Sequence, residues 1–249
     1  MRLTVMGCAG THPAADRACS SYLVEHDGYR LLVDCGNGAL SNVQKTLDPA
    51  DIDAVLLSHL HVDHFGDLYG LYYALRFHGA GPRSVPVHAP PGADRHIAQL
   101  LHGDPDDSFH AVCRFSEARP GDTLELGPLR VELHAANHPI TTLAPRISAA
   151  GAVLAYTADS GPADTLVDCA RDADLLLADC SWLERMRPLP EGVHMTAREA
   201  GELAQRAGAA RLVVTHVYPA NDLAEAAAEA AEAYGGEILI ARDLLELDL

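Results

Sequence analysis

The chain has 249 residues, of which 35 are acidic and 18 basic, so its formal net charge is −17. This length is sufficient to bury a full hydrophobic core, and the apolar content of 48% is ordinary for a globular protein. The acidic surplus disfavours a long RNA or DNA substrate, because nucleic-acid affinity depends on lysines and arginines that neutralise phosphates. We expect the surplus to serve solubility.

The first half of the chain is predicted to be rich in strands. Asp27-Gly28, a strong turn dipeptide, predicts a hairpin between the second and third strands. Strands are expected at residues 3–6, 21–25, 30–34, 54–58 and 85–89. Helices are expected at residues 36–47, 67–77 and 93–102, followed by a polar loop at 103–108. In this loop a solvated acidic run is expected, formed by Asp104, Asp106 and Asp107.

The second half again alternates strands with helices. Thr196 can cap a helix and forms a capping-box pattern with Glu199. Asn221 is predicted to cap an Ala/Glu-rich helix that runs to Tyr234, with Gly235 as its stop. A further helix is expected at residues 164–171. Strands are expected at residues 129–136, 153–157, 175–178, 211–215 and, as the last one, 237–241.

No linker, low-complexity tract or solenoid period interrupts this order. Strands followed by helices in two similar halves predict the α/β class, with one domain over residues 1–249. We expect a sheet-on-sheet core that is flanked by helices.

Four side chains that can bind metals fall within six residues, directly after the predicted strand at residues 54–58. They are His59, His61, Asp63 and His64. Buried imidazoles need hydrogen-bond partners, and three beside a carboxylate rarely all find one. Imidazole and carboxylate are zinc ligands, and a turn that leaves a strand can aim several of them at one point. The block therefore predicts a divalent metal site.

Three further polar side chains, His138, Asp159 and His216, each follow a predicted strand. Singly they are weak indications, since a lone His after a strand is more often structural and an Asp can cap a turn. Together they indicate that several strand ends deliver ligands to one edge of a sheet, where functional residues commonly lie.

The pattern His-x-His-x-Asp-His, a later His, an Asp and a final His resembles that of the metallo-β-lactamase fold hydrolases. The resemblance covers essentially the whole chain. It implies an αββα sandwich, in which two mixed β-sheets pack face to face with helices on the outside. It also implies a dinuclear metal centre, in which one ion is held by His59, His61 and His138, the other by Asp63, His64 and His216, with Asp159 bridging them.

Within this family the chain is similar to the phosphodiesterase-like and ribonuclease Z-like branch. Asp159 stands where true β-lactamases have Cys, which argues against lactam opening. His194 lies in a His-x-Thr segment like that of ribonuclease Z relatives, where the His is near the scissile phosphate. The residues between the histidine block and His138 include no glycine- and lysine-rich arm for tRNA, which argues against ribonuclease Z itself.

The resemblance implies a metal-dependent hydrolase that cleaves a small, cyclic-nucleotide-like phosphodiester. Two zinc ions (Zn²⁺) would share a hydroxide that attacks phosphorus; manganese and iron also accept this ligand set. Asp63 would also orient the nucleophile. His194 would donate a hydrogen bond to phosphate or a proton to the leaving alkoxide. Asp34 is expected either to orient a metal-binding histidine or to serve a simple turn.

Other functions stay open at this point. The same metals would also suit an ester, lactone or thioester hydrolase or a biosynthetic tailoring enzyme, by polarising a carbonyl. A ribonuclease Z-like endonuclease and an inactive metal-binding relative are less favoured. We expect a small-molecule substrate, no nucleic-acid polymer, no membrane partner and, from the family, a homodimer. Trp182, the only tryptophan, is as compatible with the core as with a base-stacking platform.

The six cysteines include no C-x-x-C pair, and several lie in apolar segments. Such usage is typical of a reduced intracellular protein rather than a disulfide scaffold. The N-terminal residues are too quickly interrupted for a signal peptide, and no apolar segment approaches the ~20 residues that span a bilayer. The sequence therefore predicts a cytoplasmic protein.

Overall fold

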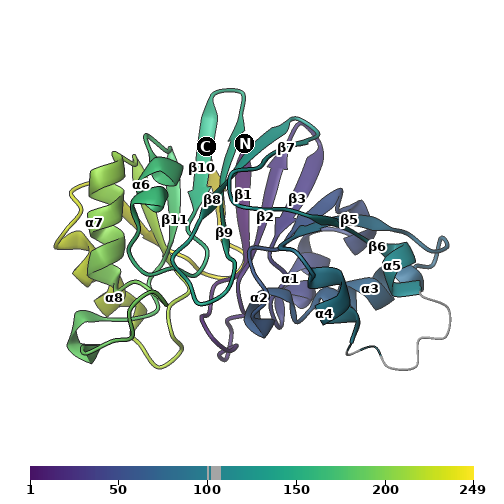
Figure 1. Cartoon of the computed structure of the whole chain (residues 1–249), viewed down its shortest axis with the longest axis horizontal. Coiled ribbons are helices and arrows are strands. Elements are labelled where there is room, and N and C mark those ends of the chain that lie inside the picture. Colours follow the sequence, from purple (N-terminus) through teal and green to yellow (C-terminus); the bar gives the residue numbers. More distant parts are fainter. Residues whose placement is uncertain (100, 102–107) are drawn as a thin grey trace.

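The computed structural model describes residues 1–99, 101 and 108–249. Two seven-stranded sheets pack face to face, and helices cover the outer face of each (Figure 1). The helices α1 to α5 lie against one sheet, and α6, α7 and α8 lie against the other (Figure 1). The predicted αββα sandwich is confirmed.

The first sheet has the strand order β14-β1-β2-β3-β4-β5-β6. Asp27 and Gly28 form the two-residue turn between β2 and β3, with φ angles of 46° and 80°, so the predicted hairpin is confirmed. Strands β3 to β6 run parallel to one another. The strands are β1 (Arg2–Gly7), β2 (Ser21–His26), β3 (Tyr29–Val33), β4 (Ala54–Leu56), β5 (Val85–Ala89), β6 (Cys113–Glu117) and β14 (Glu246–Asp248).

The second sheet has the strand order β13-β12-β11-β10-β9-β8-β7. Strands β10 to β13 are parallel, and β7 to β10 form an antiparallel meander. The strands are β7 (Thr123–Leu126), β8 (Leu129–Ala135), β9 (Leu143–Ala149), β10 (Ala152–Tyr156), β11 (Leu175–Asp179), β12 (Arg211–Thr215) and β13 (Glu237–Ile240).

The predicted helices are present, with small shifts at their ends. The capping box of Thr196 and Glu199 is complete, since each side chain accepts from the other's backbone N–H. The helices are α1 (Ala39–Thr46), α2 (Val62–Phe65), α3 (Leu68–Arg76), α4 (Ala93–Ala98), α5 (Ser108–Val112), α6 (Asp164–Ala170), α7 (Ala197–Ala207) and α8 (Leu223–Ala231), with short 3₁₀ turns at Pro49–Asp51 and Glu184–Met186.

Residues alternate between two environments along the central strands. Leu31 and Val33 of β3 face the layer between the sheets, while Leu32 faces the helices. Val213 of β12 joins the same central layer from the other sheet. Burying each such side chain contributes about 1.5–3 kcal/mol. All six cysteines are free and buried. None of the helices in the described residues is both long and apolar enough to cross a membrane.

Three predictions about the C-terminal region are wrong. The cap of α8 is Asp222, whose Oδ1 accepts from the backbone N–H groups of Ala224 and Glu225, whereas the Asn221 side chain donates to the Ser181 carbonyl. The helix ends at Ala231, before the predicted end at Tyr234. The strand predicted at 237–241 is not the last one, because β14 follows it and pairs with β1.

Besides β14, three further strands, β6, β7 and β9, were not predicted. Pro145 and Arg146 interrupt the apolar pattern of β9, and β6 and β7 are edge strands with several exposed residues. The predicted helix at 93–102 ends at Ala98. Most of the predicted loop at 103–108, with its acidic run, lies outside the described residues, and Ser108 begins α5.

Candidate metal centre

The side chains of the predicted metal pattern come from strand ends of both sheets. His59 follows β4, and the rest of its block leads into α2, with His61 as the N-cap. Asp159 follows β10, and His216 follows β12. Because β3 and β4, and likewise β10 to β12, run parallel, their carboxyl ends meet at one edge of the sandwich.

The seven predicted ligands lie in two groups that share Asp159, and in each group the potential ligand atoms are all within 4.8 Å of one another. Each group is therefore compact enough to surround one cation. The first group is His59, His61, His138 and Asp159, and the second is Asp63, His64, Asp159 and His216.

The distances show that nitrogen atoms face each other in both groups. In the first group His61 Nδ1 lies 3.2 Å from His59 Nε2 and 3.1 Å from His138 Nε2. In the second, His64 Nε2 and His216 Nε2 are 3.2 Å apart. Asp159 Oδ1 lies 3.1 and 3.2 Å from these last two atoms, and its Oδ2 lies 3.6 Å from His59 Nε2. The two carboxylate oxygens thus face different groups.

Hydrogen bonds on the outer side fix the imidazole tautomers of the first group. His138 Nδ1 donates to the Val193 carbonyl at 2.8 Å. Ser58 Oγ donates to Asp34 Oδ2 at 2.9 Å, so at 3.0 Å from His59 Nδ1 it is the acceptor. In the neutral rings of His59 and His138, Nε2 therefore carries a lone pair that points inward.

The same logic holds in the second group. His64 Nδ1 donates to Asp34 Oδ2 at 2.8 Å. His216 Nδ1 lies 2.8 Å from Ser181 Oγ, which itself donates to Asp179 Oδ1 at 2.7 Å. The inward Nε2 atoms of His64 and His216 are therefore acceptors in the neutral rings. Buried acidic residues, directly or through a serine, orient both.

These residues fit a divalent metal. Among the described residues Asp159 Oδ1 has no hydrogen-bond partner although it is buried, and imidazole nitrogens from both groups lie near this carboxylate. Such an arrangement needs positive charge, and imidazole nitrogens with carboxylate oxygens are a donor set that zinc accepts.

The pKa values point to the same need for positive charge. Burial lowers the pKa of His216, but Asp159, Asp179 and Asp63 outweigh it and raise the pKa to about 10. Burial would raise the pKa of Asp159, but the surrounding histidines hold it well below its ordinary value. Burial and neighbouring His64 keep the pKa of His59 well below its usual range.

Asp34 is the common partner of several groups beneath the centre. Fully buried, with φ of 59°, it follows β3 and accepts from the backbone N–H of Ser58 at 2.7 Å. Besides the bonds already described, it accepts from the hydroxyl of Tyr156, in the opposite sheet, at 3.2 Å. Of the two expected roles, contact with a histidine of the metal pattern, His64, is observed.

The loop after β1 completes the wall of the second group. The backbone N–H of Thr11 donates to Asp63 Oδ2 at 2.9 Å. Gly10 packs so closely that a Cβ there would lie 2.4 Å from the carbonyl oxygen of His216. Burial alone would raise the pKa of Asp63, but hydrogen bonding to His216 and the charge of His64 hold it below its ordinary range.

His194 lies beside the two groups and outside both. Its ring centroid is 5.6 Å from that of His138 and 5.4 Å from that of His216. Its Nδ1 lies 2.8 Å from Asp179 Oδ2. Burial lowers the pKa of His194, but the Asp179 carboxylate outweighs it, so the pKa is raised.

Sequence reasoning missed the role of Asp179. It is fully buried at the end of β11 and accepts from the backbone N–H groups of Ser160 and Ser181. Burial would raise its pKa, but His194 and His216 lower it to about 2. Its place at a strand end, beside β10 and β12, was the signal that could have revealed it.

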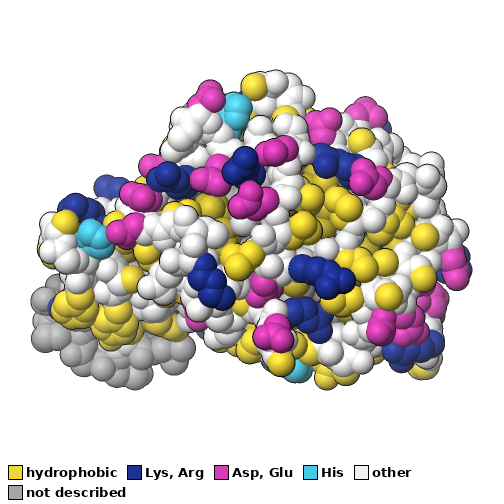
Figure 2. All heavy atoms as spheres, turned by 180° about the vertical axis from the view of Figure 1, so that it is seen from behind, with side chains coloured by type: hydrophobic (Ala, Val, Ile, Leu, Met, Phe, Trp, Pro, Cys, Tyr) yellow, Lys and Arg dark blue, Asp and Glu magenta, His cyan; other side chains and the backbone are white. Residues whose placement is uncertain are grey.

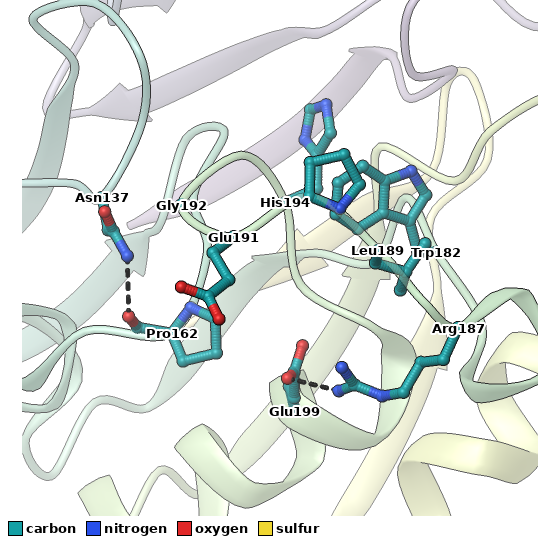
Figure 3. A pocket seen from close by; sticks show the side chains of 10 residues that line it. Asn137, Pro162, Trp182, Arg187, Leu189, Glu191, Gly192, His194 and Glu199 are labelled. Carbon is teal, nitrogen blue, oxygen red and sulfur yellow. Dashed lines mark hydrogen bonds and ion pairs between the residues drawn. The ribbon is translucent and has the colours of Figure 1, made fainter.

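A pocket of about 320 Å³ adjoins His194 (Figure 3). Trp182, which is half-buried, forms part of its wall and meets the His194 ring edge to face at 5.1 Å. An ion pair of 2.6 Å joins Arg187 to Glu199 on the opposite side of the pocket (Figure 3). Trp182 therefore lies on a pocket wall rather than in the central core.

Comparison with known proteins gives a consistent result. The family described as "Beta-lactamase superfamily domain" matches residues 29–217. The probable metallo-hydrolase YhfI of Bacillus subtilis is 34% identical over 245 residues, covering 97% of each chain. The crystal structure of YhfI superposes with a TM-score of 0.89 and 32% identity, over 99% of this chain and 98% of YhfI.

Two more distant proteins are also similar. Ribonuclease Z of Haloferax volcanii is 29% identical over 304 aligned residues, covering 100% of this chain and 95% of that enzyme. A crystal structure of a diphosphatase from the PhnP family has a TM-score of 0.77 at 20% identity, covering 100% of this chain and 97% of the other. This last likeness shows a shared fold.

Zinc should raise the melting temperature of protein from which a chelator has removed the metal. The increase in melting temperature should be larger at about pH 9 than at about pH 6.5. Because the pKa of His216 is raised in the metal-free folded protein, its proton stabilises the fold. This stabilisation is complete at pH values below the unfolded-state pKa of about 6.5. That stabilisation is lost as the pH rises towards the folded pKa of about 10. Bound zinc would replace this proton. Melting curves with and without zinc test this, and a pH-independent gain would contradict it.

Proposed function

Since the chain belongs to the beta-lactamase superfamily, we propose that it is a metallo-hydrolase that cleaves small phosphodiesters, such as cyclic nucleotides, at a dinuclear metal centre. The observation that carries the proposal is the buried carboxylate of Asp159, whose two oxygens face two separate groups of ligand atoms. A shared carboxylate between two compact donor groups suits a pair of divalent ions.

The ligand roles follow from the two groups. His59, His61 and His138 would hold one ion, and Asp63, His64 and His216 the other, with Asp159 between them. Zinc suits this donor set, and manganese or iron would also be accepted. When bound, two such ions supply Lewis acidity, which makes water a better nucleophile and neutralises charge on the reacting phosphate.

Two side chains of the protein can handle the protons of the reaction. In hydrolysis, the oxygen of water bonds to phosphorus, the bond to the leaving oxygen breaks, and that oxygen takes up a proton. Asp63, held by the Thr11 N–H, can accept a hydrogen bond from the attacking water and orient it. His194 is fixed at Nδ1 by Asp179, so its Nε2 is the atom that donates to phosphate or to the leaving oxygen.

Phosphodiester chemistry is favoured over opening of a lactam or lactone by two features. The shared ligand is a carboxylate and not the thiolate of true β-lactamases. A histidine held by a buried carboxylate lies beside both donor groups, where it can serve a leaving alkoxide. The names of two similar proteins, a ribonuclease Z and a diphosphatase, support this choice.

A small substrate is favoured over a nucleic-acid polymer. Surface cations lie beside acids, as in the pairs Arg130–Glu132 and Arg185–Glu225, and Figure 2 shows the two charge types interspersed on one face. Paired cations are poorly placed to neutralise a phosphate backbone. The ribonuclease Z alignment spans 304 positions, more than the 249 residues here, so that enzyme has segments which this chain lacks.

Protein whose metal has been removed with a chelator and replaced with zinc or manganese should hydrolyse at least one member of a panel of diesters. Renewed removal of the metal should abolish the turnover. The panel contains 2′,3′- and 3′,5′-cyclic nucleotides and bis-p-nitrophenyl phosphate. Lactone and thioester substrates serve as the comparison. Absence of metal-dependent turnover on every diester, or a clear preference for a lactone or thioester, would reject the proposal.

Asp159→Ala should lose most activity and at least one equivalent of metal, because both donor groups lose their shared oxygen ligand. Asp174→Ala is a matched control, since its carboxylate accepts from the Val153 N–H away from the donor groups. Metal analysis and turnover should be measured for both variants. Full activity in Asp159→Ala would refute the shared-ligand assignment.

His194→Asn should keep its metal and lose about 10²–10⁴-fold in kcat on substrates with an alkoxide leaving group. The loss should be much smaller for p-nitrophenyl diesters, because p-nitrophenolate leaves without a proton. Parallel kinetics on the two substrate types separate proton donation from phosphate binding. An unchanged kcat on alkoxide substrates would remove His194 from the mechanism.

A further inference from the structure

His194 separates the two donor groups from the pocket of Figure 3. Its ring lies 5.4 Å from His216 on one side, and the same residue lines the pocket on the other. Asn137, the chain neighbour of His138, also lines the pocket. In Figure 3, His194 and Trp182 lie at one end, and the Arg187–Glu199 pair lies at the other. The pocket therefore adjoins the two donor groups, with His194 between them.

In an in-line displacement the leaving oxygen departs on the side opposite the nucleophile. With His194 at the leaving oxygen, as in the function proposed above, the rest of the leaving group extends past His194. From this we infer that the pocket binds the leaving group, and that it selects an uncharged, flat heteroaromatic ring with N–H donors, such as an amino-bearing nucleobase. This inference rests on the proposed function and adds the binding site for the base.

The size and walls of the pocket suit such a ring. Its volume of about 320 Å³ is near the lower end of the range for small-molecule sites. Trp182 offers an indole face, while Leu189 and Pro162 add apolar walls. Stacking of one base on an aromatic side chain is worth about 1–3 kcal/mol, which corresponds to about fivefold in affinity at its lower end.

Carboxylates are the charged groups of the pocket lining that can accept hydrogen bonds from a ligand. The one guanidinium of the lining, that of Arg187, is already held by Glu184 at 2.7 Å and by Glu199 at 2.6 Å. The Asn137 Nδ2 group is likewise engaged, since it donates to the Pro162 carbonyl. Glu191 adds an exposed carboxylate to the lining. Ring amino groups find acceptors here, whereas a second phosphate or a carboxylate is repelled.

Trp182 is the only tryptophan, so its fluorescence reports on this pocket without any catalysis. Titration of metal-free protein with adenosine should quench this fluorescence in a saturable way. Purine riboside, which lacks the amino group and carries no ring N–H, should bind about tenfold more weakly, since a hydrogen bond to a charged acceptor is lost. Absence of quenching by adenosine, or equal binding of adenosine and purine riboside, would overturn the inference.

Calorimetric titration of variants with adenosine shows where the nucleoside binds. Trp182→Ala should weaken adenosine binding at least about fivefold, while Trp182→Phe keeps an aromatic face and most of the affinity. Glu191→Gln should reduce the preference for adenosine over purine riboside. Phe77→Ala, which changes an aromatic residue that is 70% exposed and outside the pocket lining, should bind like the parent. Unchanged binding in Trp182→Ala would place adenosine elsewhere.

Failure of this inference can be told apart from failure of the proposed function. If the parent protein binds adenosine at Trp182 but shows no metal-dependent turnover of any diester, the pocket assignment stands and the reaction is wrong. If the parent hydrolyses diesters but nucleosides do not change its Trp182 fluorescence, the proposed reaction stands and the pocket assignment is wrong.

Discussion

A buried carboxylate oxygen, which has no hydrogen-bond partner in the described part of the chain, determines much of this structure. Asp159 lies at the edge of the sandwich with its two oxygens directed at imidazoles from both sheets. A charge in such a place costs several kcal/mol unless opposite charge compensates it. In the neutral rings the outer hydrogen bonds turn the inward nitrogens into acceptors, so the compensating charge must come from a proton or from a cation. The pKa of His216, raised to about 10, shows the first route, and the donor set of this edge suits the second.

Two buried aspartates, one from each sheet, support this edge in the same way. Asp34 holds His64 directly and His59 through Ser58. Asp179 holds His194 directly and His216 through Ser181. The sheets are also joined beneath the edge, since Tyr156 donates to Asp34 and the Tyr22 hydroxyl lies 2.8 Å from that of Thr215. Packing of the sandwich and orientation of the ligands are therefore one network.

In the proposed function, a single residue would connect the reaction with the selection of substrate. The His194 ring lies 5.4 Å from that of His216 on one side and 5.1 Å from that of Trp182, in the pocket wall, on the other. Because Asp179 fixes its outer nitrogen, the ring has one orientation towards any substrate. A leaving group would thus meet the proton donor and the pocket together, so the chemistry and the choice of substrate would depend on the same ring.

The amino-acid sequence by itself determined the fold class, the hairpin at Asp27-Gly28, the capping box at Thr196 and the seven-residue metal pattern. These features depend on local periodicity, on turn chemistry or on residues directly past strand ends, all of which can be read along the chain. Only the tertiary structure decided the roles of Asp179, Ser58 and Ser181, because their partners are set by packing between strands. It also decided the edge strand β14, whose short and exposed segment carries little apolar pattern, and the pocket beside His194, which exists only where separate loops meet.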